Sequence, residues 1–234
     1  PMVRKELWTD DPETLNRRLA IYTALWHTLK TVTILFNPVT PYLSEALYQK
    51  VYRKLDPTMP DSVNFETWPK PNEKMRNKVL EKDFQTLFKC VSLVYSARQS
   101  GKLKRRWPLR AVVVMAPEKV LTVLKKVEEL FFELANVKTI EHASEASGYT
   151  SQEGWVSASE DNIHVFLDVH RDEGLLGEGL MRDLARRVQA LRKELGYVPT
   201  DVLEVVYIAE LDGESIRLMK PYLNQMKELV RAKN

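Results

Sequence analysis

Residues 108–115 read Pro-Leu-Arg-Ala-Val-Val-Val-Met, and the pattern of the chain changes there. Residues 111–115 form a continuous apolar run of strand length without a helical period. Before this run, apolar residues recur at helical spacings, and after it short apolar runs alternate with helical patterns. We therefore expect two domains: a helical bundle over residues 1–107 and a smaller α/β domain over residues 108–234.

The first half is expected to contain three helices, over residues 12–36, 41–55 and 72–100. Asp11-Pro12 offers a cap followed by proline at the first helical position, and Asn37-Pro38 ends the first helix because the residue before proline avoids the helical region. The stripe of this helix, at spacings of four and three, consists of Leu15, Leu19, Tyr22, Trp26, Leu29, Thr33 and Phe36. Residues 56–71 contain four prolines and are expected to form a connecting segment.

The second half alternates strands with helices. The strands are expected at residues 111–115, 137–141, 165–169 and 203–208, and the helices at residues 117–134, 173–196 and 215–230. Residues 143–162 are rich in Ser, Glu and Gly and predict an insertion or a hairpin. The fold class is therefore α+β, a helical bundle followed by an α/β layer.

The composition indicates an ordinary globular protein. Hydrophobic residues make up 44% of the 234 residues and charged residues 29%. The single cysteine, Cys90, excludes an internal disulfide and a cysteine-based zinc site, which favours a reducing, cytoplasmic location. No uninterrupted apolar run approaches the roughly 20 residues that cross a bilayer, so we expect no membrane partner.

The net charge of +3 is small, but the basic residues are segregated along the chain. Residues 98–110 contain six basic residues and no acid, and residues 182–193 contain five basic residues and one acid, Asp183. Lys and Arg neutralise phosphates, and an aromatic ring can stack on a splayed base. The candidate nucleic-acid contacts are Arg98, Lys102, Lys104, Arg105, Arg106, Trp107, Arg110, Arg182, Arg186 and Lys193. A solvated charged face is the alternative for both stretches, and packing under Pro108 is the alternative for Trp107.

Several segments resemble the isoleucyl-tRNA synthetases in their archaeal and eukaryotic form. Residues 7–11 (LWTDD) and 35–48 (LFNPVTPYLSEALY) resemble the anticodon-binding bundle of the isoleucyl, valyl, leucyl and methionyl enzymes. Residues 62–69 (SVNFETWP) are similar to the extended segment that follows. Residues 102–110 (KLKRRWPLR), 136–138 (NVK) and 178–194 (EGLMRDLARRVQALRKE) resemble the isoleucyl branch itself.

The resemblance implies a role in recognising tRNA. This chain would hold the anticodon stem and loop of isoleucine tRNA beside the catalytic and editing domains of a longer parent chain, since residues 3–8 look like the end of a helix already under way. ATP and magnesium are implied for the parent reaction. The family's His-Ile-Gly-His and Lys-Met-Ser-Lys-Ser signatures are missing here, so we expect no adenylate formation by this stretch and no cofactor in it.

Other chemistry finds little support in the residues. Gly174, Gly177 and Gly179 follow neither phosphate-loop pattern, so we interpret them as a turn that feeds a helix. The four histidines lack ligand spacing, and no nucleophile–base set can be assembled. The remaining alternatives are the equivalent region of a valyl-tRNA synthetase and a protein–protein docking module.

Overall fold

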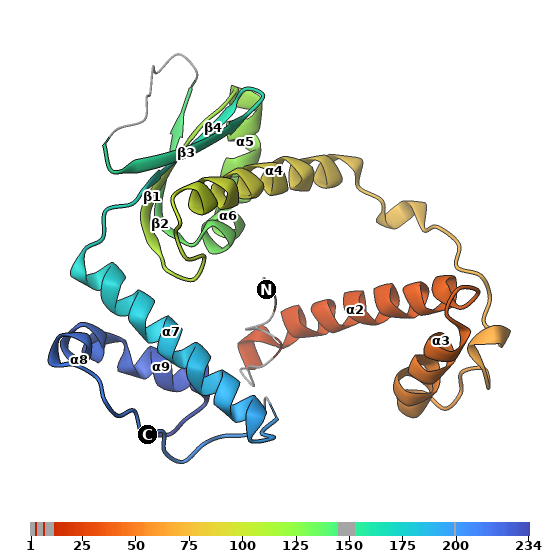
Figure 1. Cartoon of the computed structure of the whole chain (residues 1–234). Helices are drawn as coiled ribbons and strands as arrows, with labels where there is room; N and C mark the ends of the chain where they lie inside the picture. Colours follow the sequence, from red (N-terminus) through yellow and green to blue (C-terminus); the bar gives the residue numbers. More distant parts are fainter. Residues whose placement is uncertain (1–2, 4–6, 8–11, 145–152, 199) are drawn as a thin grey trace. The chain divides into compact units, whose positions relative to one another are not determined.

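The computed structural model describes residues 3, 7, 12–144, 153–198 and 200–234, which form two compact units. The first unit comprises Pro1–Asn77 and the second Lys78–Asn234. The division therefore differs from the one expected at residues 107 and 108. The reason is helix α4 (Lys78–Ser100), whose apolar face packs on the sheet of the second unit (Figure 1).

The regular secondary structure in the described residues of the first unit consists of helices and helical turns, joined by irregular segments. A 3₁₀ turn η1 (Pro12–Thr14) leads into α2 (Leu15–Phe36), which ends at Asn37-Pro38 as expected. Helix α3 (Pro41–Leu47) continues into a π-helical turn, η2 (Tyr48–Arg53), and the 3₁₀ turns η3 (Val63–Phe65) and η4 (Glu73–Met75) follow. The cap proposed at Asp11 lies outside the described residues.

The core of this unit is small. It consists of Ile34, Tyr48, Tyr52 and Val63, with Trp26 and Met59 packed against it. Most of the expected α2 stripe is exposed, including Leu19 at 53% and Leu29 at 55%. The periodicity predicted the helix correctly, but α3 and the short turns are too few to cover the whole stripe within the unit.

Helix α2 also corrects the expectation about membrane-spanning segments. Residues Pro12–Phe36 are long and apolar enough to cross a bilayer, judged by length and composition alone. The core helix of a protein outside the membrane passes the same test, as does a signal sequence.

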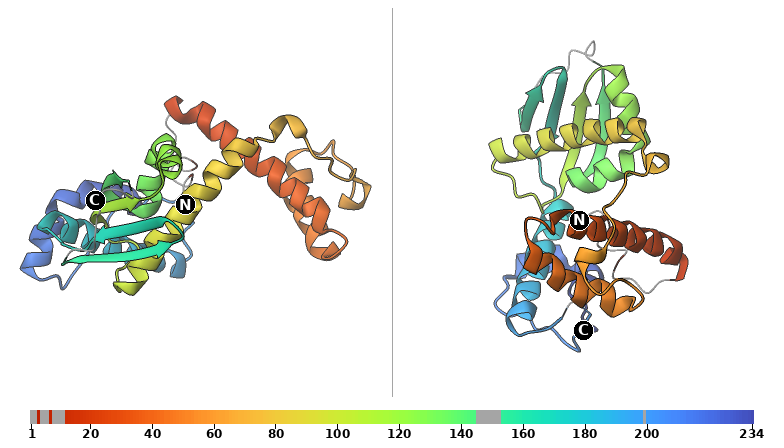
Figure 2. Two further views of the ribbon diagram at one scale, coloured as in Figure 1. Left: turned by 90° about the horizontal axis from the view of Figure 1, so that it is seen from above. Right: turned by 90° about the vertical axis from the view of Figure 1, so that its right-hand side faces the viewer.

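The second unit contains a four-stranded sheet in the order β2-β1-β4-β3. Strand β1 (Leu109–Met115) is parallel to β2 (Val137–Ala143) and antiparallel to β4 (Ile163–Asp168), which pairs with β3 (Trp155–Glu160) in a hairpin. The parallel pair requires a crossover, which α5 (Glu118–Lys126) and α6 (Glu128–Ala135) supply. Helix α4 lies across the sheet (Figure 2, right).

The main core joins α4 to the strands and the crossover helices. Leu87, Val94, Val112, Leu124 and Leu167 are completely buried in it. The mixed α+β class is therefore confirmed, and β3 accounts for part of the segment expected as an insertion or hairpin. Residues 145–152 of that segment lie outside the described residues.

A second core forms at the carboxyl end of the unit. Helix α7 (Glu173–Glu194) packs on α8 (Gly213–Met219) and α9 (Leu223–Val230) around Met181, Met219 and Met226. The helix expected over residues 215–230 is interrupted by a 3₁₀ turn, η6 (Lys220–Tyr222), where Pro221 lacks the amide hydrogen of a helix interior.

The strand expected at residues 203–208 does not form. Leu203, Glu204 and Val206 exchange backbone hydrogen bonds with the last residues of the chain instead of joining the sheet. An extended apolar run can form its backbone hydrogen bonds with a sheet or with another extended segment, such as residues 231–234. Composition alone did not distinguish these two partners.

Candidate nucleic-acid interface

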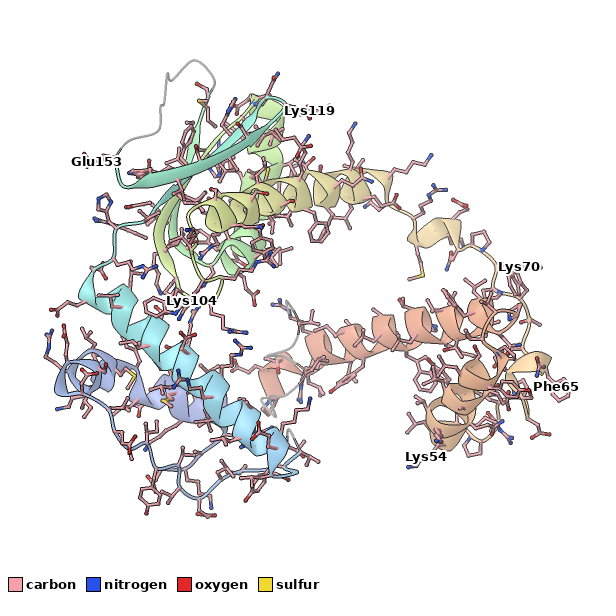
Figure 3. All side chains as sticks on the ribbon, in the orientation of Figure 1. Lys54, Phe65, Lys70, Lys104, Lys119 and Glu153 are labelled. Atoms are coloured by element: carbon pink, nitrogen blue, oxygen red, sulfur yellow. The ribbon has the colours of Figure 1, made fainter. Side chains whose placement is uncertain are left out.

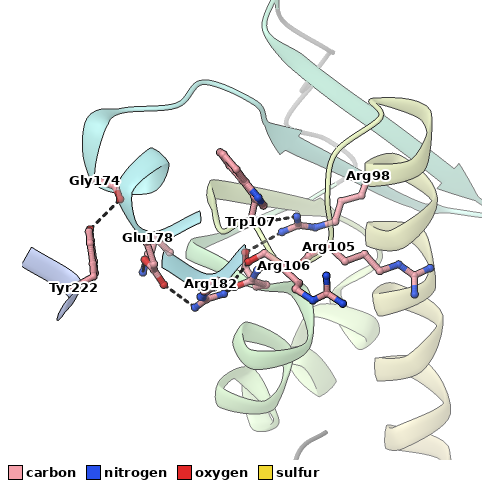
Figure 4. Close-up of polar contacts among 10 residues, drawn as sticks. Arg98, Arg105, Arg106, Trp107, Gly174, Glu178, Arg182 and Tyr222 are labelled. Carbon is pink, nitrogen blue, oxygen red and sulfur yellow. Dashed lines mark hydrogen bonds and ion pairs between the residues drawn. The ribbon is translucent and has the colours of Figure 1, made fainter. Parts of the chain in front are cut away.

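Arg98 holds the loop between α4 and β1. Its Nη1 donates to the carbonyls of Lys104 (3.2 Å) and Trp107 (2.9 Å), and its Nη2 donates to those of Ala135 (2.8 Å) and Asn136 (2.9 Å) (Figure 4). The residue is 1% exposed, and burial lowers the pKa of its guanidinium to about 10. Arg98 therefore ties residues 104–107 to the end of α6. Because its side chain faces inward, we expect this structural role in place of the predicted tRNA contact.

Trp107 anchors the loop to α7. Its indole Nε1 donates to Oδ2 of Asp183 at 3.0 Å, and the Arg171 guanidinium lies 4.9 Å from the ring centroid. A Cβ on Gly179 would come within 2.6 Å of the ring, so only glycine permits this approach. The ring packs against α7, so we expect a packing role for Trp107 in place of the predicted tRNA contact. Gly174, Gly177 and Gly179 all lie within α7, and the turn expected at these glycines is therefore wrong.

Arg182 is also occupied within the protein. It donates to the backbone oxygen of Arg106 (3.1 Å), to Oδ1 of Asn136 (2.7 Å) and to Oε1 of Glu178 (2.6 Å). Glu178 is 4% exposed and pairs with Lys138 as well, at 2.6 Å. Arg182 therefore compensates a buried carboxylate, and we expect this structural role in place of the predicted phosphate contact.

The remaining basic residues of the two stretches meet in one hollow. It has a volume of about 750 Å³ and is lined by Lys104, Arg105, Arg106, Asp183, Arg186, Arg187 and Ala190. Five cations and one carboxylate give this surface a formal charge of +4. Two stretches that are about 80 residues apart in sequence are brought together because Trp107 and Arg182 fasten the loop to α7.

The cations of the hollow differ in how far they are already engaged. Lys104 pairs with Asp183 at 2.9 Å, and the Arg105 guanidinium lies 4.3 Å above the Tyr95 ring. Figure 4 shows Arg105 reaching toward α4. Among the residues that the structure describes, Arg106, Arg186 and Arg187 have no side-chain hydrogen bond and no ion pair within 4 Å. These three arginines remain available to an anionic ligand.

The sequence reasoning missed Arg187 and included residues outside the hollow. Lys102, Arg110 and Lys193 are exposed but do not line it. The helical period could have indicated Arg187, since Asp183, Arg186, Arg187 and Ala190 recur at i, i+3, i+4 and i+7 and so share one face of α7. Figure 3 locates Lys104 where the sheet end meets α7, whereas Lys119 lies at the other end of the sheet.

Among the described residues that line the hollow, Asp183 is the one acid. Burial favours its neutral form, but hydrogen bonds from Lys104 and Trp107 and the charges of Lys104 and Arg106 outweigh burial and hold its pKa below the usual value. The carboxylate is therefore ionised at neutral pH.

The arrangement is suited to binding and not to catalysis. Guanidinium groups match phosphate oxygens in charge and geometry, and they remain charged at any physiological pH. Within the described ranges, no three His, Cys, Asp or Glu side chains gather to hold a metal ion.

Comparisons with known proteins agree with a binding role. Residues 1–113 match the family model for the anticodon-binding domain of tRNA ligases. Over 99% of its length the chain is 28% identical to an isoleucine–tRNA ligase of Methanosarcina mazei, and 27% identical over 99% to that of Pyrococcus furiosus. An isoleucine–tRNA ligase of Dehalococcoides mccartyi is 28% identical over 95% of the chain.

The chain spans 28%, 26% and 22% of these three relatives. The family match covers the first unit, α4, the loop and most of β1, whereas the similarity to the isoleucine–tRNA ligases extends through α7 and beyond. The resemblance seen in the sequence is confirmed: residues 1–113 match the family model of the anticodon-binding domain of tRNA ligases, and the chain is similar over 99% of its length to isoleucine–tRNA ligases.

Proposed function

We propose that this chain is the tRNA-binding carboxyl-terminal region of an isoleucyl-tRNA synthetase and that it positions the anticodon stem and loop of isoleucine tRNA. The observation that carries the proposal is the cationic hollow, in which Arg106, Arg186 and Arg187 have no partner among the described residues. The match of residues 1–113 to anticodon-binding domains identifies the class of ligand.

The chemistry of the hollow suits the backbone of RNA more than its bases. Arginine and lysine neutralise phosphates and so fix the register of a nucleic acid, whereas base contacts specify sequence. The aromatic rings beside the hollow are already covered, Tyr95 by Arg105 and Trp107 by Lys104 and Arg171. The hollow would therefore fix the position of the tRNA, and recognition of anticodon bases would fall to other surfaces, including the first unit.

The parent reaction would be the ATP-dependent attachment of isoleucine to tRNA in the cytoplasm. ATP and magnesium would act in the catalytic domain of the parent chain, and the residues described here would bind and orient tRNA. The purified 234-residue chain should accordingly show no isoleucine-dependent pyrophosphate exchange above a control for contaminating host enzyme. Pyrophosphate exchange clearly above this control would show that the 234-residue chain itself catalyses adenylate formation, and it would contradict our placement of catalysis in another domain.

The proposal is tested by equilibrium binding at several salt concentrations. Labelled isoleucine tRNA, valine tRNA and a random RNA of equal length would be titrated with the purified chain. We expect isoleucine tRNA to bind most tightly. The logarithm of its affinity should fall as the logarithm of the salt concentration rises, because basic side chains that neutralise phosphates displace the counterions condensed on the RNA. Tightest binding of valine tRNA would favour the valyl enzyme, and absence of RNA binding would favour a protein–protein docking module.

A further inference from the structure

Asp183 is the one negatively charged side chain among the described residues of a hollow that otherwise favours anions. It stands between Lys104 and Arg106 of the loop and Arg186 and Arg187 of its own helix. Its Oδ2 accepts hydrogen bonds from Lys104 Nζ at 2.9 Å and from Trp107 Nε1 at 3.0 Å. Its Oδ1 receives no hydrogen bond from any residue that the structure describes.

The anchoring role of Asp183 requires only one of its two oxygens and no full charge. An amide oxygen would accept from Trp107 equally well. The second oxygen therefore remains an acceptor without a donor, in a side chain that is 27% exposed and lines the hollow.

An ionised carboxylate changes which anions the hollow prefers. It accepts hydrogen bonds but donates none, and phosphate oxygens likewise only accept. A ligand made only of phosphates gains from the five cations and is repelled by Asp183. A ligand that carries a neutral hydrogen-bond donor next to its phosphates gains from the cations and also satisfies Oδ1.

We propose that Asp183 is a specificity-determining residue that makes the hollow prefer a polynucleotide with a hydrogen-bond donor beside its phosphates over anions that lack one. The inference rests on the proposed function, since RNA is the ligand of this chemistry. The donor can be a ribose 2′-hydroxyl or the amino group of a base, and both are neutral donors within reach of a backbone phosphate.

Two substitutions separate the two roles of Asp183, accepting a hydrogen bond from the ligand and holding Trp107. Asp183→Asn keeps an oxygen for Trp107 and removes the charge, whereas Asp183→Ala removes both oxygens. Glu194→Gln is the matched control, because it removes the same charge from α7 at a residue that does not line the hollow. Trp107→Phe reports what loss of the indole hydrogen bond does by itself, and thermal melting of each variant checks the fold.

The full 234-residue chain would be titrated with an RNA stem-loop, a DNA stem-loop of the same sequence and linear polyphosphate of matched charge. In both Asp183 variants polyphosphate should bind more tightly, because a repulsive charge is gone. The ratio of RNA affinity to polyphosphate affinity should fall by about tenfold, the lower end of what a hydrogen bond to a charged group contributes. Glu194→Gln should leave this ratio unchanged.

The DNA arm identifies the source of the donor. A fall in the RNA-to-DNA ratio assigns the donor to the 2′-hydroxyl, and an unchanged ratio, with both polynucleotides losing against polyphosphate, assigns it to a base. If all three ligands shift by one common factor, or if none shifts, Asp183 acts only as a charge or an anchor and the inference is overturned. Failure of the unaltered chain to bind RNA would instead contradict the proposed function.

Discussion

Two basic stretches, one at the end of α4 and one along α7, have similar compositions. They differ in which of their residues are engaged within the protein and which have no partner among the described residues. Each contains an arginine that is almost fully buried and donates to backbone carbonyls: Arg98 to four and Arg192 to three. In the loop, the exposed cations Lys104 and Arg105 already have partners. On α7, Arg186 and Arg187 have none within the described residues.

The comparison indicates that backbone carbonyls with spare acceptor capacity, more than the charges themselves, determine the role of these two buried arginines. The last carbonyls of a helix have no partner within the helix, and those of Ala135 and Asn136 at the end of α6 receive the guanidinium of Arg98. Arg192 likewise supplies donors to Val198, Asp201 and Val230, where the chain folds back past the end of α7. Arginine is suited to this role because its planar group carries five donors.

The largest effect is expected from Arg98→Met, which keeps an apolar stem but leaves the carbonyls of Trp107 and Ala135 without a donor. The carbonyls of Lys104 and Asn136 lose one of two donors, because each also accepts from a backbone amide. The free energy of unfolding should fall by about 3 kcal/mol or more, since a buried acceptor left unpaired costs ~1–3 kcal/mol. Urea denaturation of the full chain measures this change. Arg110→Met, at an exposed position of β1, is the control and should lower it by less than about 0.5 kcal/mol. An Arg98 variant as stable as this control would show that the carbonyls are satisfied without it.

Cys90 gives a local readout of the same change. Burial raises the pKa of its thiol to about 11, so at pH 8 the reactive thiolate is scarce in the folded protein. Labelling by a thiol reagent should therefore be slow in the unaltered chain and should become faster in Arg98→Met, because Cys90 belongs to the core that α4 forms with the sheet.

The second effect concerns affinity and separates the free arginines from the engaged ones. Replacing Arg106, Arg186 and Arg187 together by glutamine should flatten the slope of log affinity against log salt by about 2, at roughly 0.7 for each lost single-strand phosphate contact. Stability should change little, because none of the three has a partner among the described residues. Salt-dependent RNA titration measures the slope.

A triple change of Lys119, Lys125 and Lys220 to glutamine is the matched control. These exposed lysines lie outside the hollow. Their replacement lowers the net charge of the chain by the same amount as the triple arginine change, but the slope of log affinity against log salt should stay that of the unaltered chain. Equal slopes in both triple variants would mean that the hollow does not contact phosphate. The surface would then have to be sought on the first unit, where Arg17 and Arg18 belong to α2.

The sequence predicted the elements better than their packing. The spacing of apolar residues correctly indicated α2, α4 and α7, because helical period is a local property. It did not reveal that α4 packs with the sheet, since a stripe such as Leu87, Val91 and Val94 fits a helix bundle and a sheet face equally. Residues 203–208 were misread for the same reason: the partner of an extended run lies elsewhere in the chain.

The candidate site was predicted as two stretches but not residue by residue. Counting charges found both sides of the hollow. It could not reveal that Arg98, Trp107 and Arg182 are engaged within the protein, because the acceptors that engage them, such as Asn136 and Asp183, are brought near only by the fold.

A third, smaller effect tests the structural role of Arg182. Arg182→Gln shortens the side chain and removes one of the two cations that pair with the buried Glu178, leaving Lys138 alone. The free energy of unfolding should fall by about 1–2 kcal/mol, while the salt slope of RNA binding stays unchanged. Thermal melting and the salt titration together distinguish this from a phosphate contact, which would flatten the slope and spare the stability.

The smallest effect should come from Lys193→Gln, which sets the limit of the hollow along α7. Lys193 is exposed in the last turn, seven residues after Arg186, and this spacing puts the two on one face about 10 Å apart. Loss of its charge near the helix terminus should cost ~0.3–1 kcal/mol of stability at low salt. The salt slope should match that of the unaltered chain, because Lys193 does not line the hollow. Arg187→Gln, measured in parallel, should flatten the slope by about 0.7. If Lys193→Gln flattens it as much, the RNA runs on along α7 and the interface is longer than the hollow.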